Sequence, residues 1–394
     1  MTNDFYVKIR IKEGDRMNKI IVAADSFKGS LSSRQIAALI ERQTRAVCPQ
    51  FCVESIVISD GGEGLVDAGV DAGYFSPVHQ ESCDPYGRPI RAVWGIHQQE
   101  ALIELAQCSG LQLCEQRDPS RASTLGTGLQ IRQALQQGCR TIWIGLGGSG
   151  THDGGCGIAA ALGAVFLTKD GSSLIPRGAN LQDIHAIDLS GLDPRLKQTR
   201  LICLCDVNNP AVGPQGAAAV FARQKGADDR MIQQLEQNTL HLGQLIEKLT
   251  HQPLINEPGT GAAGACGLAL QGLLQARVSP GLPQLLRWNQ LDQRLKDACL
   301  VVTGEGKIDS QSLAGKVPMG ILRAARPHHV PVVALCGILD IDREQMRQMG
   351  FADAFSINPP HLSPAEMMEQ APQRLQQAWH DWFSRHYRQF LERC

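Results

Sequence analysis

The sequence is poor in aromatic residues and has no excess of charge of either sign. Phe, Trp and Tyr make up 5% of its 394 residues, and the formal net charge is −1. A near-neutral chain with scattered basic residues has no general electrostatic attraction to nucleic acid or to an anionic membrane surface. No apolar run in the sequence is long enough to span a bilayer. We therefore expect neither nucleic acid nor a membrane as a partner.

The usual cysteine patterns of disulfide scaffolds and zinc sites are also missing. The 13 cysteines are odd in number, dispersed and without a CxxC pair, which predicts reduced, mostly buried thiols and a cytoplasmic protein. The first 16 residues are charged and lack the apolar centre of a signal peptide. We expect residues 1–16 to be an N-terminal tail that precedes the folded part.

The order of the predicted elements indicates an α/β fold with two domains. A strand, an acidic loop and a helix follow one another at the start of the chain, and strand patterns of the same kind return near its end. Between these blocks a hairpin and strands that run into Gly-, Asn- and Pro-rich loops predict a different unit. We expect a Rossmann-like, doubly wound parallel-sheet domain that is discontinuous, an inserted second α/β domain, and an active site in the cleft between them. The predicted bounds are 17–79 with 286–394 for the first domain and 80–285 for the inserted one.

Two helix starts can be read from capping residues. Ser32 and Gln35 have the spacing of a capping box, and Ser363 and Glu366 repeat it with a proline at the first helical position. Pro372 is expected to kink or restart the second of these helices.

Acidic residues follow the ends of several predicted strands. A single glycine–aspartate pair is ordinary turn chemistry, but ligands of open parallel sheets bind beyond the carboxyl ends of the strands. Five acids in that position favour an active site. Asp25, Asp60 and Glu305 belong to the first predicted domain, and Asp153 and Asp206 to the second.

The segment GLGGSGTHDGG at residues 145–155 follows the strand-like run TIWI and holds six glycines. Its G-x-G-x-x-G pattern, with Asp170 farther on, leaves an NAD-dependent oxidoreductase as an alternative. Further glycines, however, delay the helix until about Ile158, and the chain has no G-x-x-x-x-G-K-[ST] loop. We interpret the segment as a nest of main-chain amides for phosphate oxygens, to which the following helix would add its positive end.

Eight blocks of the sequence, in order, resemble those of the bacterial glycerate kinase family. They are ADSFKGSLSS, SDGGEGLVDA, IELAQCSGL, STLGTGLQIRQAL, GLGGSGTHDGGCG, CDVNNPAVGPQGAAAVFARQKGA, GTGAAGACGLAL and TGEGKIDSQSLAGK. The resemblance implies ATP-dependent phosphorylation of D-glycerate, usually at the 2-hydroxyl to give 2-phosphoglycerate, in the cleft of a Rossmann-like domain interrupted by a second domain. A 3-kinase that gives 3-phosphoglycerate stays an alternative, as does a sugar-acid sensor without turnover. The oligomeric state, including a homodimer, is left open.

Phosphoryl transfer depends on positioning and on neutralisation of charge, and the predicted roles follow from that. Main-chain amides of the glycine segment would hold the ATP phosphates, and Mg²⁺ would bind Asp206 or Asp153. Asp60 is the first candidate for the base that orients or deprotonates the hydroxyl, with Asp309 second; these two and Asp206 are the catalytic candidates. The amides are those of Gly147, Gly148, Ser149 and Gly150, and the residues expected to hold glycerate are Ser26, Lys28 and Lys307.

The sequence departs from the family pattern at a few positions in and near these blocks. His152 stands where an asparagine is expected, Gly150 where an alanine is expected, and Leu125 at a usually aromatic position. Lys307 replaces a usual arginine, which keeps the charge and loses the bidentate fork. These differences concern substrate preference more than the reaction.

Overall fold

A computed structural model describes residues 18–27, 29–58, 62, 64–310, 317–359 and 362–391. The chain divides into two compact units, one formed by the described residues of Met1–Ser59 and Leu282–Cys394, the other by those of Asp60–Gly281. The predicted tail, Asp60 and Lys28 lie outside the described residues.

The first unit is built around a five-stranded parallel sheet. The strand order β14-β13-β12-β1-β2 places β1 and β2 on one side and the late strands on the other. This is the flavodoxin-like version of the doubly wound order, with its switch point between β1 and β12. The strands are β1 (Asn18–Ala24), β2 (Phe51–Ser55), β12 (Ala298–Ile308), β13 (Val332–Leu339) and β14 (Asp353–Ser356).

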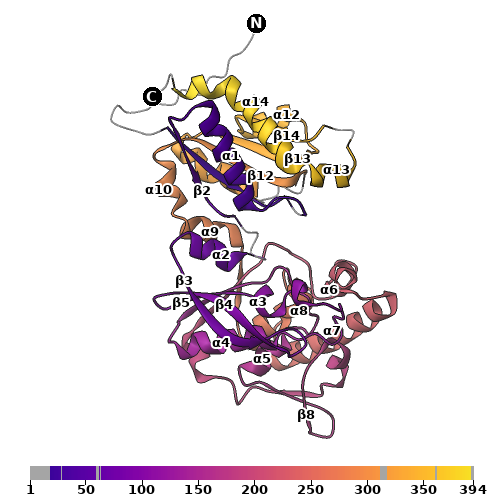
Figure 1. The fold of residues 1–394 in the computed structure, drawn as a ribbon. Helices are drawn as coiled ribbons and strands as arrows, with labels where there is room; N and C mark the ends of the chain where they lie inside the picture. Colours follow the sequence, from indigo (N-terminus) through magenta and orange to yellow (C-terminus); the bar gives the residue numbers. More distant parts are fainter. Residues whose placement is uncertain are drawn as a thin grey trace. The chain divides into compact units, whose positions relative to one another are not determined.

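Helices cover both faces of this sheet, and α1 lies beside α14 (Figure 1). Alternate residues of β1 face opposite ways, so Ile20 and Val22 join a core with the α14 aromatics Trp379 and Phe383. The aromatic residues of α14 thus form a packing face. The helices are α1 (Ser33–Val47), α9 (Gly281–Trp288), α10 (Leu291–Leu295), α11 (Val317–Ala325), α12 (Arg343–Met349), α13 (Pro364–Glu369) and α14 (Ala371–Leu391).

The predicted helix starts are confirmed. Ser32 and Gln35 form a reciprocal capping box at α1, and Ser363 and Glu366 form another at α13. The chain ends α13 at Glu369 and starts α14 at Ala371, next to Pro372, as expected for a restart.

The second unit holds a six-stranded mixed sheet in the order β11-β10-β6-β5-β4-β3. Its strands β5, β6, β10 and β11 are parallel, and the predicted hairpin of β4 and β5 is antiparallel. A second small antiparallel sheet is formed by β7, β8 and β9. The strands are β3 (Ser76–Cys83), β4 (Pro89–His97), β5 (Glu100–Glu104), β6 (Thr141–Gly145), β7 (Val165–Leu167), β8 (Ser173–Leu174), β9 (Ala186–Asp188), β10 (Arg200–Leu204) and β11 (Arg277–Ser279).

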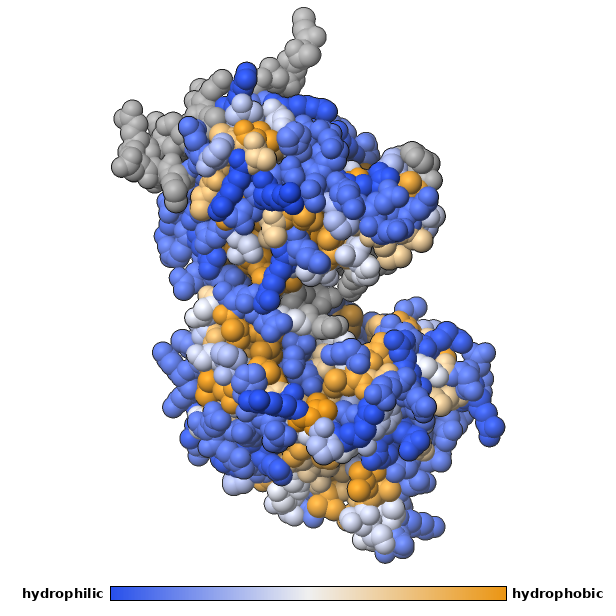
Figure 2. Space-filling model, in the orientation of Figure 1, coloured by the Kyte–Doolittle hydropathy of each residue, from blue (hydrophilic) through white to orange (hydrophobic). Residues whose placement is uncertain are grey.

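Helices α4 to α8 of the second unit bury a large apolar core with its strands. The helices of this unit are α2 (Leu65–Asp71), α3 (Ala106–Ser109), α4 (Leu125–Gln136), α5 (Cys156–Ala161), α6 (Ala217–Phe221), α7 (Asp229–Thr250) and α8 (Ala262–Gly267). The part of the chain that the structure describes contains no helix both long enough and apolar enough to cross a bilayer. Figure 2 shows hydrophilic residues over most of the visible face, with hydrophobic residues in separate groups.

The structure places the unit boundaries differently from the predicted ones. The first change of unit comes at residues 59/60 rather than 79/80, and the second at 281/282 rather than 285/286. The reason is that α2 packs against β4 and β5, and β3 pairs along its whole length with β4. The run VESIVISD (residues 53–60) has the sequence pattern of a strand, but β2 ends within it, at Ser55.

Candidate functional site

Three parallel strands of the second unit end side by side. The register pairs Glu104 of β5 with Gly145 of β6, and Gly145 with Leu204 of β10. The loops that follow these residues therefore leave the same edge of the sheet, which is where parallel sheets bind ligands.

The glycine loop (residues 145–155) leaves the middle of these three strands. Its residue Ser149 forms an isolated bridge with Gly110, with hydrogen bonds from the Leu111 amide to the Gly148 carbonyl and from the Gly150 amide to the Ser109 carbonyl. The Gly150 amide, expected to bind phosphate, is thus engaged by the protein. The amides of Gly147, Gly148 and Ser149 donate no hydrogen bond to another described residue.

The outer part of the glycine loop is open to solvent. Gly148 is exposed and adopts a left-handed φ of 72°, a conformation that glycine tolerates without strain. Gly147 is half-buried, and the position that a Cβ would take on it lies against the main chain of Gly62. The exposed amides of this stretch can therefore still serve as an anion nest.

Asp153 has a structural role in the loop. Its side chain is fully buried and accepts hydrogen bonds from Thr124, by amide and hydroxyl, and from the amides of Gly155 and Gly157. Burial raises the pKa of this carboxyl, and these hydrogen bonds act in the opposite direction. Hydrogen bonds from the first turn of α5 thus occupy lone pairs of the Asp153 carboxylate. The six-residue helix starts at Cys156, not near Ile158, and its first amides face Asp153 rather than a ligand.

Two further buried groups lie beside Asp153. His152 is fully buried with Nε2 3.1 Å from the Thr239 hydroxyl, and burial lowers its pKa to about 3. The Lys225 ammonium donates to the Ser149 Oγ at 2.7 Å and to the Thr151 carbonyl at 2.8 Å. Sequence reasoning missed Lys225, although a lysine beside the alanine-rich run AAAVFA was a signal for it.

Glu104 is a second residue that the sequence reading missed, although it lies in the quoted block IELAQCSGL. Its carboxylate is buried and accepts from the amides of Gly64 and Val66, both at 3.1 Å. These bonds tie the start of α2 to the end of β5. Gly62, two residues after Asp60 in the chain, is held against Gly147 just before this anchored turn.

Asp206 follows the end of β10 and is exposed. Its Oδ1 accepts a hydrogen bond from the Gly281 amide at 3.1 Å, at the start of α9. An exposed carboxylate beside two asparagines (Asn208 and Asn209) is a donor set that Mg²⁺ accepts together with phosphate oxygens and water. Asp206 therefore fits a metal better than Asp153. The described residues contain no group of three or more His, Cys, Asp or Glu placed to hold a metal by themselves.

The switch point of the first unit lies between the ends of β1 and β12. The Asp25 amide donates to the Gly304 carbonyl, and the Ser26 amide donates to the Asp25 carboxylate at 2.7 Å. The expectation that Glu305 follows a strand end is wrong. β12 continues to Ile308, and Glu305 is a buried residue paired with Cys336 of β13.

Lys307 and Asp309 lie together at the far end of β12. The Lys307 ammonium is 2.9 Å from Asp340 and 3.6 Å from Asp309, and the hydrogen bond to Asp340 raises its pKa. Lys307 is about half exposed. The cation is thus held by two carboxylates of the same unit, which leaves a net negative cluster at this sheet end.

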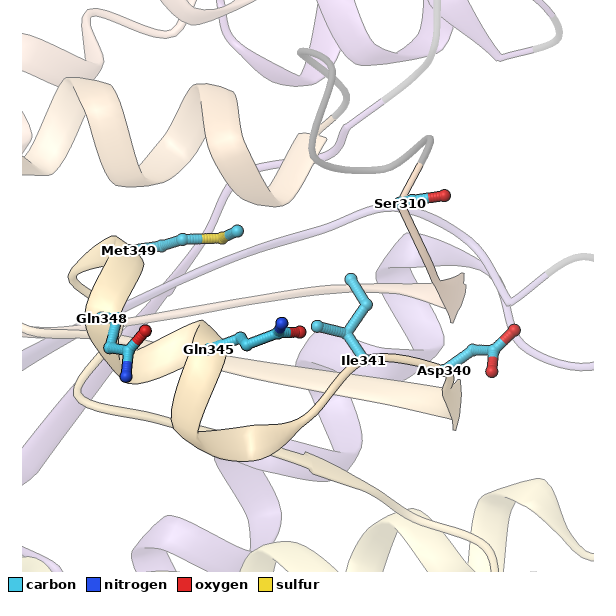
Figure 3. A pocket seen from close by; sticks show the side chains of 6 residues that line it. All are labelled: Ser310, Asp340, Ile341, Gln345, Gln348 and Met349. Atoms are coloured by element: carbon cyan, nitrogen blue, oxygen red, sulfur yellow. The ribbon is translucent and has the colours of Figure 1, made fainter.

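A depression of about 520 Å³ lies next to this cluster (Figure 3). Asp340 lines it, but its carboxylate points away from the other five side chains (Figure 3). None of the predicted site residues lines it. The residues that do are Ser310, Asp340, Ile341, Gln345, Gln348 and Met349.

The oxidoreductase alternative finds no support in the sheet topology. In a dinucleotide fold the ribose acid follows the parallel strand next to the glycine-bearing one. Asp170 instead lies in the exposed turn between β7 and β8, which belong to the small antiparallel sheet.

The fold and the loops at its sheet edges define the class of protein. It is an α/β protein with glycine-rich and acidic loops at the carboxyl ends of its parallel strands, which is the arrangement of enzymes that act on small molecules. Residues 20–385 match the glycerate kinase family. The chain belongs to this family and is a kinase.

Individual relatives agree with that assignment. The glycerate 2-kinase of Escherichia coli K12 is 41% identical over 86% of this chain and 90% of its own length. The glycerate kinase of Bacillus subtilis 168 is 40% identical over 92% of this chain and 96% of its own. A solved structure from Salmonella typhimurium LT2, provisionally assigned as glycerate kinase 2, has a TM-score of 0.78 and 35% identity, and covers 95% of this chain and 99% of its own.

Proposed function

We propose that this kinase transfers the γ-phosphoryl group of ATP to the 2-hydroxyl of D-glycerate and releases 2-phosphoglycerate. The observation that carries the proposal is the glycine loop around the exposed Gly148, where the amides of Gly147, Gly148 and the buried Ser149 make no hydrogen bond to another described residue. The E. coli relative named glycerate 2-kinase supports the 2-hydroxyl. Phosphorylation at the 3-hydroxyl is the alternative outcome.

In the second unit these amides and the Ser149 hydroxyl bind the phosphate oxygens of ATP. Main-chain donors fixed before the reaction stabilise negative charge without reorganisation. Asp206 and the neighbouring asparagines are the proposed protein ligands of Mg²⁺, which supplies neutralisation of the phosphate charge when bound. Asp153 is not proposed as a ligand, because its oxygens cap α5.

Asp60 is proposed as the base that orients or deprotonates the glycerate hydroxyl. Its neighbourhood in the sequence supports this role: Gly62 contacts the glycine loop, and Glu104 anchors the turn that begins at Gly64. In the first unit Ser26, Lys28 and Lys307 are the proposed ligands of the glycerate carboxylate, and Lys307 must exchange its ion pair with Asp340 for that role. Asp309 is the second candidate for the base, and its pairing with Lys307 favours a role in holding that lysine.

The test is to incubate the protein with ATP, Mg²⁺ and D-glycerate and to identify the product by phosphorus NMR. The proposal requires the signal of 2-phosphoglycerate, and a 3-phosphoglycerate signal would select the alternative. Asp60→Asn should lower kcat at least about 100-fold, the usual size of a general-base effect. A kcat within a few-fold of the wild type would reject Asp60 as the base.

A further inference from the structure

The glycine loop carries no charged side chain on its exposed stretch, but a cation lies buried beneath it. The Lys225 side chain reaches the loop from the short helical turn Arg223–Lys225, and the residue is 2% exposed. Its ammonium donates to Ser149 Oγ and to the carbonyl of Thr151. It therefore spans Gly150 and fixes the loop on both sides of it.

The buried ammonium is held by neutral oxygens. Both hydrogen bonds that the Lys225 Nζ makes to described residues go to uncharged groups, the Ser149 hydroxyl and the Thr151 carbonyl. The titratable groups that act on it are Asp153, Cys114, Cys266 and His152, of which Asp153 is engaged at α5. A buried cation without a paired anion is unfavourable, and burial lowers the pKa of Lys225 to about 8. A bound anion at the loop would supply the missing negative charge.

The direction of the hydrogen bond also matters. Since the ammonium can only donate, Ser149 Oγ accepts from it, and the hydroxyl hydrogen must point to a different acceptor. No described residue accepts a hydrogen bond from this hydroxyl. A donor polarised by an adjacent cation forms stronger hydrogen bonds.

We propose that Lys225 is a positioning residue for the nucleotide: it turns the Ser149 hydroxyl into an obligate donor to a phosphate oxygen of ATP, and it holds the loop in the shape that presents the amides of Gly147 and Gly148. The inference rests on the proposed function of the loop. It assigns Lys225 to the phosphate end of ATP and not to glycerate.

The test is a double-mutant cycle with Lys225→Met, Ser149→Ala and the double variant, with Lys248→Met on the exposed side of α7 as the matched control. Methionine fills the volume of the lysine stem but leaves the buried Thr151 carbonyl without its donor, which costs about 1–3 kcal/mol of the free energy of unfolding. We expect Lys225→Met and Ser149→Ala each to raise the KM for ATP about tenfold, the effect of losing a hydrogen bond to a charged group. The KM for D-glycerate should change less than about twofold, and the double variant should equal the worse single variant, because both remove one interaction.

Three results would overturn the inference. These are an unchanged ATP KM in Lys225→Met, effects that multiply in the double variant, and equal rises in both KM values. If Lys225→Met does not fold, Ser149→Ala alone decides. An unchanged KM for ATP in Ser149→Ala would show that the Ser149 hydroxyl donates no hydrogen bond to the nucleotide. Calorimetric titration of the same variants with a non-hydrolysable ATP analogue keeps this test separate from the reaction itself: a wild type that binds the analogue but makes no phosphoglycerate refutes the proposed function alone.

Discussion

Gly147→Ala probes the contact between the glycine loop and the segment that contains Gly62. A Cβ on residue 147 would lie 2.2 Å from the Gly62 Cα and 3.0 Å from the Gly62 nitrogen. Ordinary contacts begin at 3.4 Å, so the two main chains must separate by about 1.2 Å. Both partners are backbone, and Glu104 anchors the chain at Gly64, so no flexible side chain can absorb the shift.

The expected effect on activity is large and that on stability moderate. Overpacking of this kind costs about 1–3 kcal/mol of the free energy of unfolding. A misplacement of about 1 Å between reacting groups costs about 100-fold in rate. We therefore expect kcat/KM to fall about 100-fold in an assay of ADP release with D-glycerate, while urea unfolding shows a folded protein.

Gly171→Ala is the matched control. Gly171 lies in the exposed turn between β7 and β8 at a φ of 84°, with no atom near the new Cβ. Its left-handed conformation costs an alanine about 1 kcal/mol, yet activity should stay at the wild-type level. If Gly147→Ala keeps kcat/KM within threefold of the wild type, the contact with Gly62 does not position reacting groups and the reasoning fails.

Three further predictions separate structural from chemical roles. Asp206→Asn should lower kcat about 100-fold and raise the Mg²⁺ concentration needed for half activity. Because Asp206 is exposed, the free energy of unfolding should change by less than about 1 kcal/mol. An unchanged Mg²⁺ titration would exclude Asp206 as a ligand. Asp153→Asn should lower the free energy of unfolding in urea by about 3 kcal/mol, because an amide NH₂ would face donors of Thr124 and Gly157. A stable variant with a weakened Mg²⁺ response would show that Asp153 is a metal ligand and not a structural residue. His152 has its pKa lowered to about 3 from an unfolded value of 6.5, so the unfolded state takes up the proton first and stability falls with pH below about 6.5. The wild type should lose about 2 kcal/mol more than His152→Asn between pH 7 and pH 5, and equal losses in urea midpoints would show that His152 is protonated in the folded state.

The local signals of the sequence were reliable where neighbours in the chain decide the structure. The capping boxes at Ser32 and Ser363 form as the spacing predicts, because both partners lie within one turn. The strand cores were also found, since runs such as TIWI bury both faces between helices. The family resemblance was carried by the same short blocks.

Packing between distant segments decided to which unit a segment belongs and whether an acidic residue is buried or exposed. The sequence pattern of a strand, an acidic loop and a helix assigns α2 to the first unit, but α2 packs on β4 and β5. Glu305 looks like a loop residue by its glycine neighbours, yet pairing with β13 keeps it in the strand. Asp153 and Asp206 have similar sequence surroundings, but only Asp153 is enclosed by the turn of α5.

Patterns within about ten residues thus establish the elements, the glycine loop and membership of the glycerate kinase family. Lys225, the buried partner of that loop, and Glu104, which anchors the start of α2, come from segments 76 and 40 residues away from the groups they hold. Hydrogen bonds across such separations leave no periodic trace in a single chain, because they depend on which strand ends meet at one edge of the sheet. Folding in three dimensions is what distinguishes a carboxylate that caps a helix from one that is exposed to a ligand.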